Sequence, residues 1–387
     1  MLFVGPTATS QQIAWHHAIS NDDWLSVVAK RTYLVDRGRL LLAPEQEPLR
    51  ILEGDPSRTG TIVHEADIYP FKPLTDIVVQ GHAYPPRPQD TSFIAKVEVG
   101  PASKALLVVG DRQATLSPTG RIIYSPSEPI EKVPLTYEVA YGGIDLVAEE
   151  KYGNPMMAFD RYRRPEFQPE YHSPFIYPRN AAGRGYLIEA TREAVDALQL
   201  PNIEDPYDPI SKRGLAVENV LRWPSMPLPW GTNWLHPSFF PRIAYLGASR
   251  QFEPPTGPWP EVRRGFAEAP WPKLGHITEA MDYRFFNAGS LGLQLPPLQG
   301  DLSTLEFRLV ALHPTGRDFT FRLPAKPPRI WVDGRNGSFT ATNPVVHHVV
   351  IEPDRNTVHV VWRGHARALR PYTEPELEKM PYKIEWD

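Results

Sequence analysis

The charged residues between Asp67 and Tyr84, in the stretch DIYPFKPLTDIVVQGHAY, are the first candidates for chemistry. Its prolines lack a backbone donor and disfavour helical geometry in the residue before them, so Asp67, Lys72 and Asp76 are predicted on an extended ribbon. The β-branched run 77–79 that follows predicts a buried strand. This stretch therefore places ionised groups next to a hydrophobic core.

Carboxylates could supply the chemistry of a glycosidase, which needs two of them about 5 to 10 Å apart in a cleft. The candidates are Asp67, Asp76, Glu138, Glu204 and Asp205. The structural alternative is that Asp67 or Asp76 pairs with Lys72, and that Asp111 with Arg112 organises a turn. Ion pairs near strand ends are commoner than catalytic dyads, so the pattern favours structural roles and we assign no catalytic residue.

Other residues that could bind a metal or cofactor give weaker signals. His16–His17 and His347–His348 are adjacent pairs, and adjacent side chains of a strand point to opposite faces, which disfavours chelation of one metal. The chain contains no HExxH, GxxxxGK or GxSxG motif, so the commonest zinc protease, nucleotide-binding and hydrolase classes are not indicated. We predict neither a metal nor a cofactor.

Glycine-rich pieces at 141–143 and 183–185 predict backbone kinks that need positive φ. Arg184 lies between two of these glycines and could bind an anion. A single arginine in a turn is usually solvated, and no helix start adds a dipole here, so the kink interpretation is favoured.

Composition places this chain among ordinary globular proteins, with 387 residues, 41% hydrophobic residues and a formal net charge of -4. The absence of cysteine excludes disulfides, thiolate metal sites and cysteine nucleophiles. The near-neutral charge predicts no nucleic-acid partner, and no long apolar run predicts a membrane span. The N-terminus MLFVGPTATSQQ does not resemble a secretory signal, so we predict a cytoplasmic protein.

The chain is rich in proline, with 44 prolines against the roughly 20 that average usage would give. Aromatic residues make up 11% of it, which disordered chains do not match. We therefore predict rigid, ordered loops and few, short helices.

Short strands separated by turn residues are predicted toward both ends of the chain, as in an antiparallel sandwich or open barrel. Residues 25–42 predict a hairpin that turns at Asp36-Arg37-Gly38. Further strands are predicted at 77–79, 93–99, 105–109, 121–124, 136–141, 305–312, 319–323, 330–332, 345–351 and 358–362. Asn336-Gly337 predicts a hairpin turn before a strand at 339–340.

Three regions follow from this pattern. Residues 1–150 and 301–387 are predicted to be β regions that pack as one body, and 151–300 to be a proline- and aromatic-rich irregular region. Within it only 189–200 has helical character, with Thr191 as the N-cap. The segment 223–242 is interpreted either as an irregular cover whose Trp223, Trp230, Trp234, Phe239 and Phe240 plug the core, or as an exposed surface that meets another protein.

Several blocks, taken in order, resemble a family of uncharacterised-domain proteins encoded beside type VI secretion spike genes in Gram-negative bacteria. The blocks are DIYPFKPLTDIVVQGHAY, Gly110-Asp111-Arg112, PLTYEVAYGG (134–143), NAAGRG (180–185), LPNIEDP (200–206), Trp223-Pro224 and Trp362-Arg363. The resemblance is collective and covers most of the chain.

This resemblance implies a cytoplasmic adaptor or chaperone, with no reaction. Such a protein would bind an effector that carries or joins a PAAR-type spike tip, cover its apolar or unpaired-strand surface, and help load it onto the VgrG spike. The candidate protein-binding residues are Asp67, Lys72, Asp76, Arg112, Tyr141, Trp230 and Trp234. The same blocks could equally determine the fold, with client recognition in the middle region.

Overall fold

The fold was described from a computed structural model of the chain. The structure describes residues 2–3, 12–19, 22–50, 64–69, 71–152, 175–177, 179–215, 227–237, 239, 241–245, 282–333, 335, 337–379 and 381–386.

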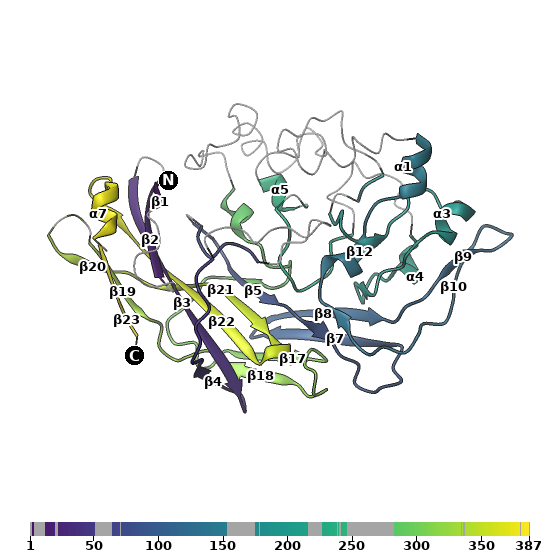
Figure 1. The fold of residues 1–387 in the computed structure, drawn as a ribbon, viewed down its shortest axis with the longest axis horizontal. Coiled ribbons are helices and arrows are strands. Elements are labelled where there is room, and N and C mark those ends of the chain that lie inside the picture. Colours follow the sequence, from purple (N-terminus) through teal and green to yellow (C-terminus); the bar gives the residue numbers. More distant parts are fainter. Residues whose placement is uncertain are drawn as a thin grey trace.

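The largest sheet takes its strands from both ends of the chain (Figure 1). In spatial order they are β1 (Leu2–Phe3), β2 (Gln12–Ile19), β3 (Asp22–Asp36), β22 (Thr357–Ala368), β21 (Val345–Glu352), β5 (Thr75–Val79) and β15 (Gln294–Leu295). Two further strands join it: β4 (Arg39–Leu42) on β3 and β16 (Leu298–Gln299) on β21. The C-terminal strands β22 and β21 therefore lie between the N-terminal strands β3 and β5 in one sheet.

A second sheet packs against one face of the first. Its order is β14 (Ile203–Glu204), β8 (Ala102–Val109), β7 (Ser92–Val99), β17 (Glu306–Val310) and β18 (Phe319–Arg322). The largest apolar cluster joins the two layers, for example Val349, Val360 and Trp362 of the first with Val97 and Phe307 of the second. The predicted fold class is confirmed: the protein is mainly β, in open layers with few short helices.

Within the largest sheet one pairing departs from the antiparallel expectation, because β5 runs parallel to β21. Parallel neighbours need a long connection, and the whole middle of the chain lies between these two strands. Both strands are buried on both faces, as parallel strands usually are. A continuous apolar run such as Ile77–Val79 does not reveal the direction of its neighbour.

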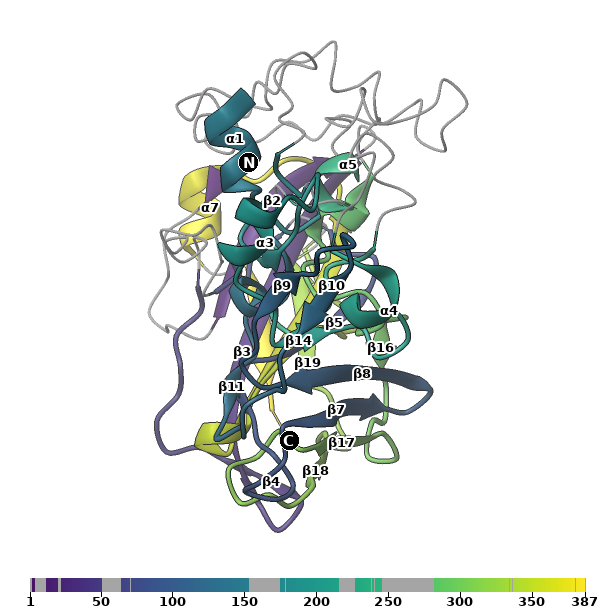
Figure 2. The same cartoon turned by 90° about the vertical axis from the view of Figure 1, so that its right-hand side faces the viewer.

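Smaller elements gather at the two ends of the molecule in Figure 1, and Figure 2 turns the first of these ends toward the viewer. One end holds β9 (Ala114–Leu116), β10 (Ile122–Tyr124), β12 (Tyr141–Gly142), β13 (Arg184–Gly185), α1 (Leu146–Tyr152), α3 (Arg192–Asp196) and α4 (Ile210–Arg213). The other holds β19 (Arg329–Asp333), β20 (Phe339–Ala341), β23 (Tyr382–Glu385) and α7 (Glu374–Glu378). The remaining described elements are β6 (His82–Ala83), β11 (Val133–Pro134), α5 (Arg242–Tyr245) and the 3-10 turns η1 (Tyr137–Val139), η4 (Tyr283–Phe286) and η5 (Pro353–Arg355).

Most local predictions hold. The β3–β4 hairpin turns at Arg37 and Gly38, both at positive φ. In α3 the Thr191 side chain accepts a hydrogen bond from the Ala194 N–H, at 3.2 Å, so the predicted N-cap is confirmed. The strand pairing β19–β20 is present, but its loop is longer than a two-residue turn, and Asn336 lies outside the described residues.

The predicted strand at 136–141 is wrong. Tyr137–Val139 form a 3-10 turn, and only Tyr141 and Gly142 are extended, pairing in parallel with Arg184 and Gly185. The two glycine-rich pieces therefore meet each other. A Cβ on Gly142, which has φ +151°, would lie 2.1 Å from the Asn180 carbonyl oxygen, so only glycine fits this crossing.

We expect Gly142→Ala to destabilise the protein by about 3 kcal/mol or more, since it adds a clash to a left-handed backbone. The matched control is Gly120→Ala, where φ is +78° but no atom lies within 4 Å of the added Cβ. That variant should cost only about 1 to 2 kcal/mol. Urea unfolding of both variants measures the difference, and equal losses would contradict the proposed crossing.

Candidate functional site

The face of the large sheet that points away from the second sheet carries buried charges. Strand register aligns Asp76 with His348, His348 with Val361, and Val361 with Lys30, so these residues form one row across β5, β21, β22 and β3. Paired residues on neighbouring strands share a face. The next residue along a strand points to the other face: Trp362, which follows Val361 in β22, points into the apolar core.

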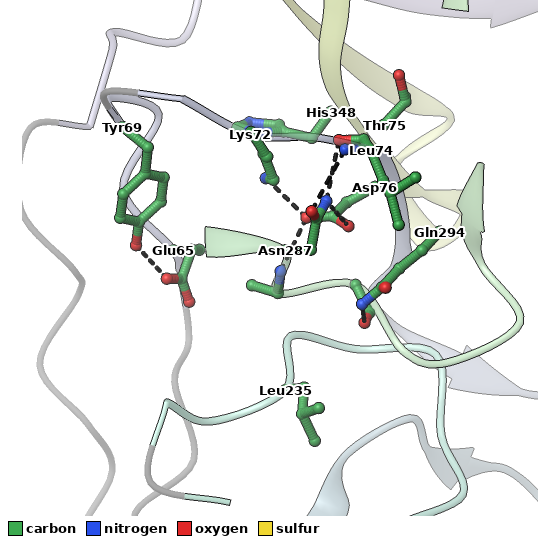
Figure 3. Close-up of polar contacts among 12 residues, drawn as sticks. Glu65, Tyr69, Lys72, Leu74, Thr75, Asp76, Leu235, Asn287, Gln294 and His348 are labelled. Carbon is green, nitrogen blue, oxygen red and sulfur yellow. Dashed lines mark hydrogen bonds and ion pairs between the residues drawn. The ribbon is translucent and has the colours of Figure 1, made fainter. Parts of the chain in front are cut away.

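The Asp76 carboxylate has three partners within the fold (Figure 3). Its carboxylate lies 2.7 Å from the Lys72 Nζ and accepts hydrogen bonds from the Asn287 side chain, at 3.0 Å, and the Ala288 N–H, at 2.9 Å. The side chains of Lys72 and Asp76 are fully buried. The predicted structural pairing of Lys72 with Asp76 is thus present, and it fastens the ribbon to the segment before β15.

Asp67 is held by the sheet. Its carboxylate accepts hydrogen bonds from the Lys30 Nζ at 3.1 Å, the His348 Nε2 at 2.8 Å and the Arg50 N–H at 2.8 Å. Burial alone would raise the pKa of Asp67, but the Lys30 ammonium, His348 and the Arg50 N–H outweigh it and hold that pKa well below its usual range. The Asp67 carboxylate is therefore ionised in the folded protein at neutral pH.

A third pair closes the layer. Arg242 meets Glu65 with two hydrogen bonds, Nη1 to Oε2 at 3.2 Å and Nη2 to Oε1 at 3.0 Å, and Tyr69 donates to the same carboxylate. We call this set the ionic layer. Its members are Lys30, Glu65, Asp67, Lys72, Asp76, Arg242 and His348.

Five of the seven predicted binding residues are therefore not placed to contact a partner. Asp67, Lys72, Asp76, Tyr141 and Trp234 are all buried, and each has its polar or aromatic group against other parts of the chain. Tyr141 donates its hydroxyl to the Leu215 carbonyl at 2.7 Å. Burial makes these residues determinants of the fold, the second of the two interpretations that the sequence left open.

Arg112 also acts inside the fold. It pairs with Glu204 and donates to the Pro201 carbonyl, so it does not organise a turn with Asp111 as predicted. Asp111 instead accepts a hydrogen bond from Asn202 at 2.9 Å. Arg184 donates to Asn202 and lines two neighbouring cavities of about 810 and 390 Å³.

The described part of the aromatic segment covers the structure. Trp234 is buried, with its ring centroid 5.3 Å from that of His348, and Phe239 is buried with Tyr137. Trp230 is half-buried, donates its Nε1 to the Ala105 carbonyl, and lies 4.3 Å from the Lys104 Nζ. Trp223 and Phe240 lie outside the described residues.

The histidine pair in β21 does not alternate as predicted. A bulge between Val346 and His348 breaks the register, and the two rings, both buried, lie 5.2 Å apart. His16 and His17 lie in β2, but their side chains are not described. In the described ranges no three histidine, aspartate or glutamate side chains are close enough to hold a metal.

The sequence did not lead us to three members of the ionic layer, Lys30, Glu65 and Arg242. Lys30 lies beside Arg31 inside the strand segment Val27–Tyr33, and adjacent side chains of a strand point to opposite faces. Two adjacent cations in such a strand place one on each face of the sheet, which was a usable signal that one of them is buried and paired. Glu65 and Arg242 carried no such signal, since they lie 177 residues apart in the sequence and no local pattern pairs them. The same holds for Asn287, which bonds to Asp76 from 211 residues away.

The described part of the chain exposes apolar groups elsewhere. Leu34 and Leu41 are directly opposite each other on β3 and β4, and 39% and 50% of their surfaces are exposed. Leu42, the last residue of β4, is 55% exposed. We call Leu34, Leu41 and Leu42 the leucine edge.

No helix in the described ranges is long and apolar enough to cross a membrane.

We expect Asp76→Asn to destabilise the protein by about 3 to 5 kcal/mol, because it leaves the Lys72 ammonium buried without its counter-charge. Glu306→Gln is the control, since its pair with Arg322 is exposed and should cost about 0 to 1 kcal/mol. Adding Lys72→Met to Asp76→Asn should recover part of the loss, as measured by chemical unfolding. A double variant no more stable than the single one would show that charge is not the cause.

We also expect stability to fall as the pH falls below about 6.5. Burial lowers the pKa of His236 and His365 to about 4 and that of His347 well below its ordinary value, so the unfolded chain takes up protons before the folded one does. Each histidine that stays neutral in the folded protein at pH 5 lowers the free energy of unfolding by up to about 2 kcal/mol between pH 7 and pH 5. His347→Phe should reduce this loss, as measured by urea unfolding at both pH values, and an unchanged pH dependence would contradict the assignment.

The chain was compared with known proteins. One family model, described as an uncharacterized protein conserved in bacteria (DUF2169), matches residues 20–363. No curated protein and no solved structure matches the chain. Because the family model spans most of the sequence, this chain belongs to the bacterial family DUF2169.

Proposed function

We propose that this protein is a cytoplasmic adaptor or chaperone that binds a type VI secretion effector, or its PAAR-type spike tip, and helps load it onto the VgrG spike. The sequence blocks that resemble proteins encoded beside spike genes motivate the secretion assignment. The observation that carries the binding role is the leucine edge, an exposed apolar strand at the side of the large sheet.

The leucine edge has the features of a strand-addition site. β4 pairs only with β3 among the described strands, so its other side has no strand partner there. Its hairpin turn lies against β18, the edge strand of the second sheet, with the Thr320 carbonyl oxygen 3.6 Å from the position of a Cβ on Gly38. A client strand added to β4 would gain main-chain hydrogen bonds and cover Leu41 and Leu42.

The base of this hairpin is rigid. The Gln46 side chain accepts a hydrogen bond from the Thr32 N–H at 2.9 Å and donates to the Thr32 carbonyl at 3.0 Å. The Thr32 hydroxyl in turn bonds to His359 of β22 at 3.1 Å. A docking edge that is already ordered loses little conformational entropy on binding.

The alternative of a carbohydrate-active hydrolase draws less support from the site. Asp67, Asp76 and Glu204 are each buried against a cation. Asp205 accepts a hydrogen bond from the Tyr207 N–H in an exposed turn, at 2.8 Å. A general acid needs a carboxyl whose pKa is raised, whereas the environment of Asp67 holds its pKa down.

We expect Leu41→Lys to abolish capture of the effector without destabilising the fold, because a lysine on an edge strand opposes strand addition. Ile123→Lys is the matched control, since Ile123 is 54% exposed on β10 of a separate small sheet. The measurement is the soluble fraction of the effector encoded next to this gene, and its co-purification, on co-expression with each variant. Equal capture of the effector by both variants would show that β4 is not the effector-binding site.

The adaptor role itself is tested by the unmodified protein. Effector that is equally soluble with and without it, together with sugar turnover that Glu138→Gln abolishes, would favour the hydrolase instead.

A further inference from the structure

A cavity of about 540 Å³ shares no lining residue with the ionic layer or the leucine edge. Three loops form its described walls: Tyr84–Pro88, Pro129–Glu131 and Pro314–Gly316. The first of these loops begins at Tyr84, the last residue of the sequence block that ends in QGHAY.

The walls offer almost no backbone hydrogen-bond donors. Five lining residues are prolines, which have no N–H: Pro85, Pro86, Pro88, Pro129 and Pro314. The N–H groups of four others are already used: Tyr84 donates to the Ala311 carbonyl, Ile130 to the Asp90 carbonyl, Thr315 to His313 Nδ1 and Gly316 to the His313 carbonyl. A ligand that fits therefore gains little from acceptors and must bring donors of its own.

Tyr84 gives the cavity a fixed aromatic wall. Its hydroxyl donates to Asp354 at 3.0 Å, and His82 holds the other oxygen of that carboxylate at 2.7 Å. Burial and the Asp354 carboxylate raise the pKa of Tyr84 to about 12, so the hydroxyl stays protonated and the bond to Asp354 persists. The electron-rich face of a tyrosine ring attracts cations.

The lining charge is negative. Glu131 is the charged residue among the described walls, it is exposed, and within the described ranges its carboxylate forms no ion pair. Arg87, in the same loop as Pro86 and Pro88, pairs with Asp90 at 3.1 Å and does not line the cavity. The site therefore combines apolar walls, acceptors, one aromatic face and one carboxylate.

We infer that this cavity receives an arginine side chain of a protein client. A guanidinium has five N–H donors and no acceptor, is planar enough to stack on a tyrosine ring, and carries the charge that complements Glu131. This inference rests on the proposed function in one respect: the arginine belongs to the client that the adaptor binds.

The test uses the purified full-length protein and no effector. A fluorescein-labelled peptide, Gly-Ser-Gly-Arg-Gly-Ser, is titrated by fluorescence polarisation against the same peptide with citrulline, which keeps the shape of arginine but not its charge. We expect the arginine peptide to bind at least about tenfold more tightly at low salt, and 0.5 M salt to narrow the difference.

Glu131→Gln should remove this preference, whereas Glu193→Gln, the same charge change on the exposed face of α3, should keep it. Both positions are exposed, so neither variant should unfold the chain. Equal binding of the two peptides, binding of neither, or equal effects of the two variants would each overturn the inference.

Effector capture is measured in parallel with Glu131→Gln and Leu41→Lys. If the peptide preference is absent while Leu41→Lys still abolishes capture, the cavity inference fails and the adaptor proposal stands. If the peptide preference depends on Glu131 but the effector is never captured, the adaptor proposal fails alone.

Discussion

The structure depends on burying paired charges on one face of its largest sheet. Removing an ion from water costs several kcal/mol, so this face is stable only when every carboxylate meets its cation at hydrogen-bond distance. Lys30, Asp67, Lys72 and Asp76 meet this condition by joining β3 and β5 to the proline-bearing ribbon between them. Arg242 and Asn287 add the middle of the chain to the same face. Segments far apart in sequence are thereby fixed against a single layer.

An element of the fold or the site could be predicted from the sequence when its interactions join residues that are close together in the sequence. Alternation of Phe319, Phe321 and Leu323 and the Thr191 cap depend on neighbours in sequence, so the strand and the short helix were predictable. The pairing of Lys72 with Asp76 was also local. The bond between His348 and Asp67 and the parallel pairing of β5 with β21 join distant segments, and no local pattern specifies such partners. The predicted binding residues Asp67, Lys72 and Asp76 are buried for the same reason, because charge in a ribbon predicts polarity but not which segment covers it.

The two faces of the large sheet serve different ends. The face with Val349, Val360 and Trp362 gains stability from apolar burial, which tolerates small shifts between the layers. Ion pairs and hydrogen bonds on the other face depend steeply on distance and direction, so that face fixes how the covering segments lie. Glu65 bonded twice by Arg242, and Asp76 bonded by Lys72, Asn287 and Ala288, leave few alternative arrangements. This face therefore holds the covering segments in one arrangement, as a protein that presents a fixed binding surface requires.

An exposed leucine strand at a sheet edge is a hazard that most proteins avoid, by charge, by proline or by a covering segment. Arg39 supplies one charge at the start of β4, but Leu41 and Leu42 at its end have none beside them in the strand. β4 has only four residues, which limits the number of hydrogen bonds that a chance partner can gain. A client that adds a strand of matching length and also binds at a second site would bind far more tightly than one that offers the strand alone. Once the first site is occupied, the second contact forms within the same complex at a high effective concentration. A short apolar edge on a rigid body therefore favours selective capture over aggregation, which is the requirement that an adaptor of an aggregation-prone client has to meet.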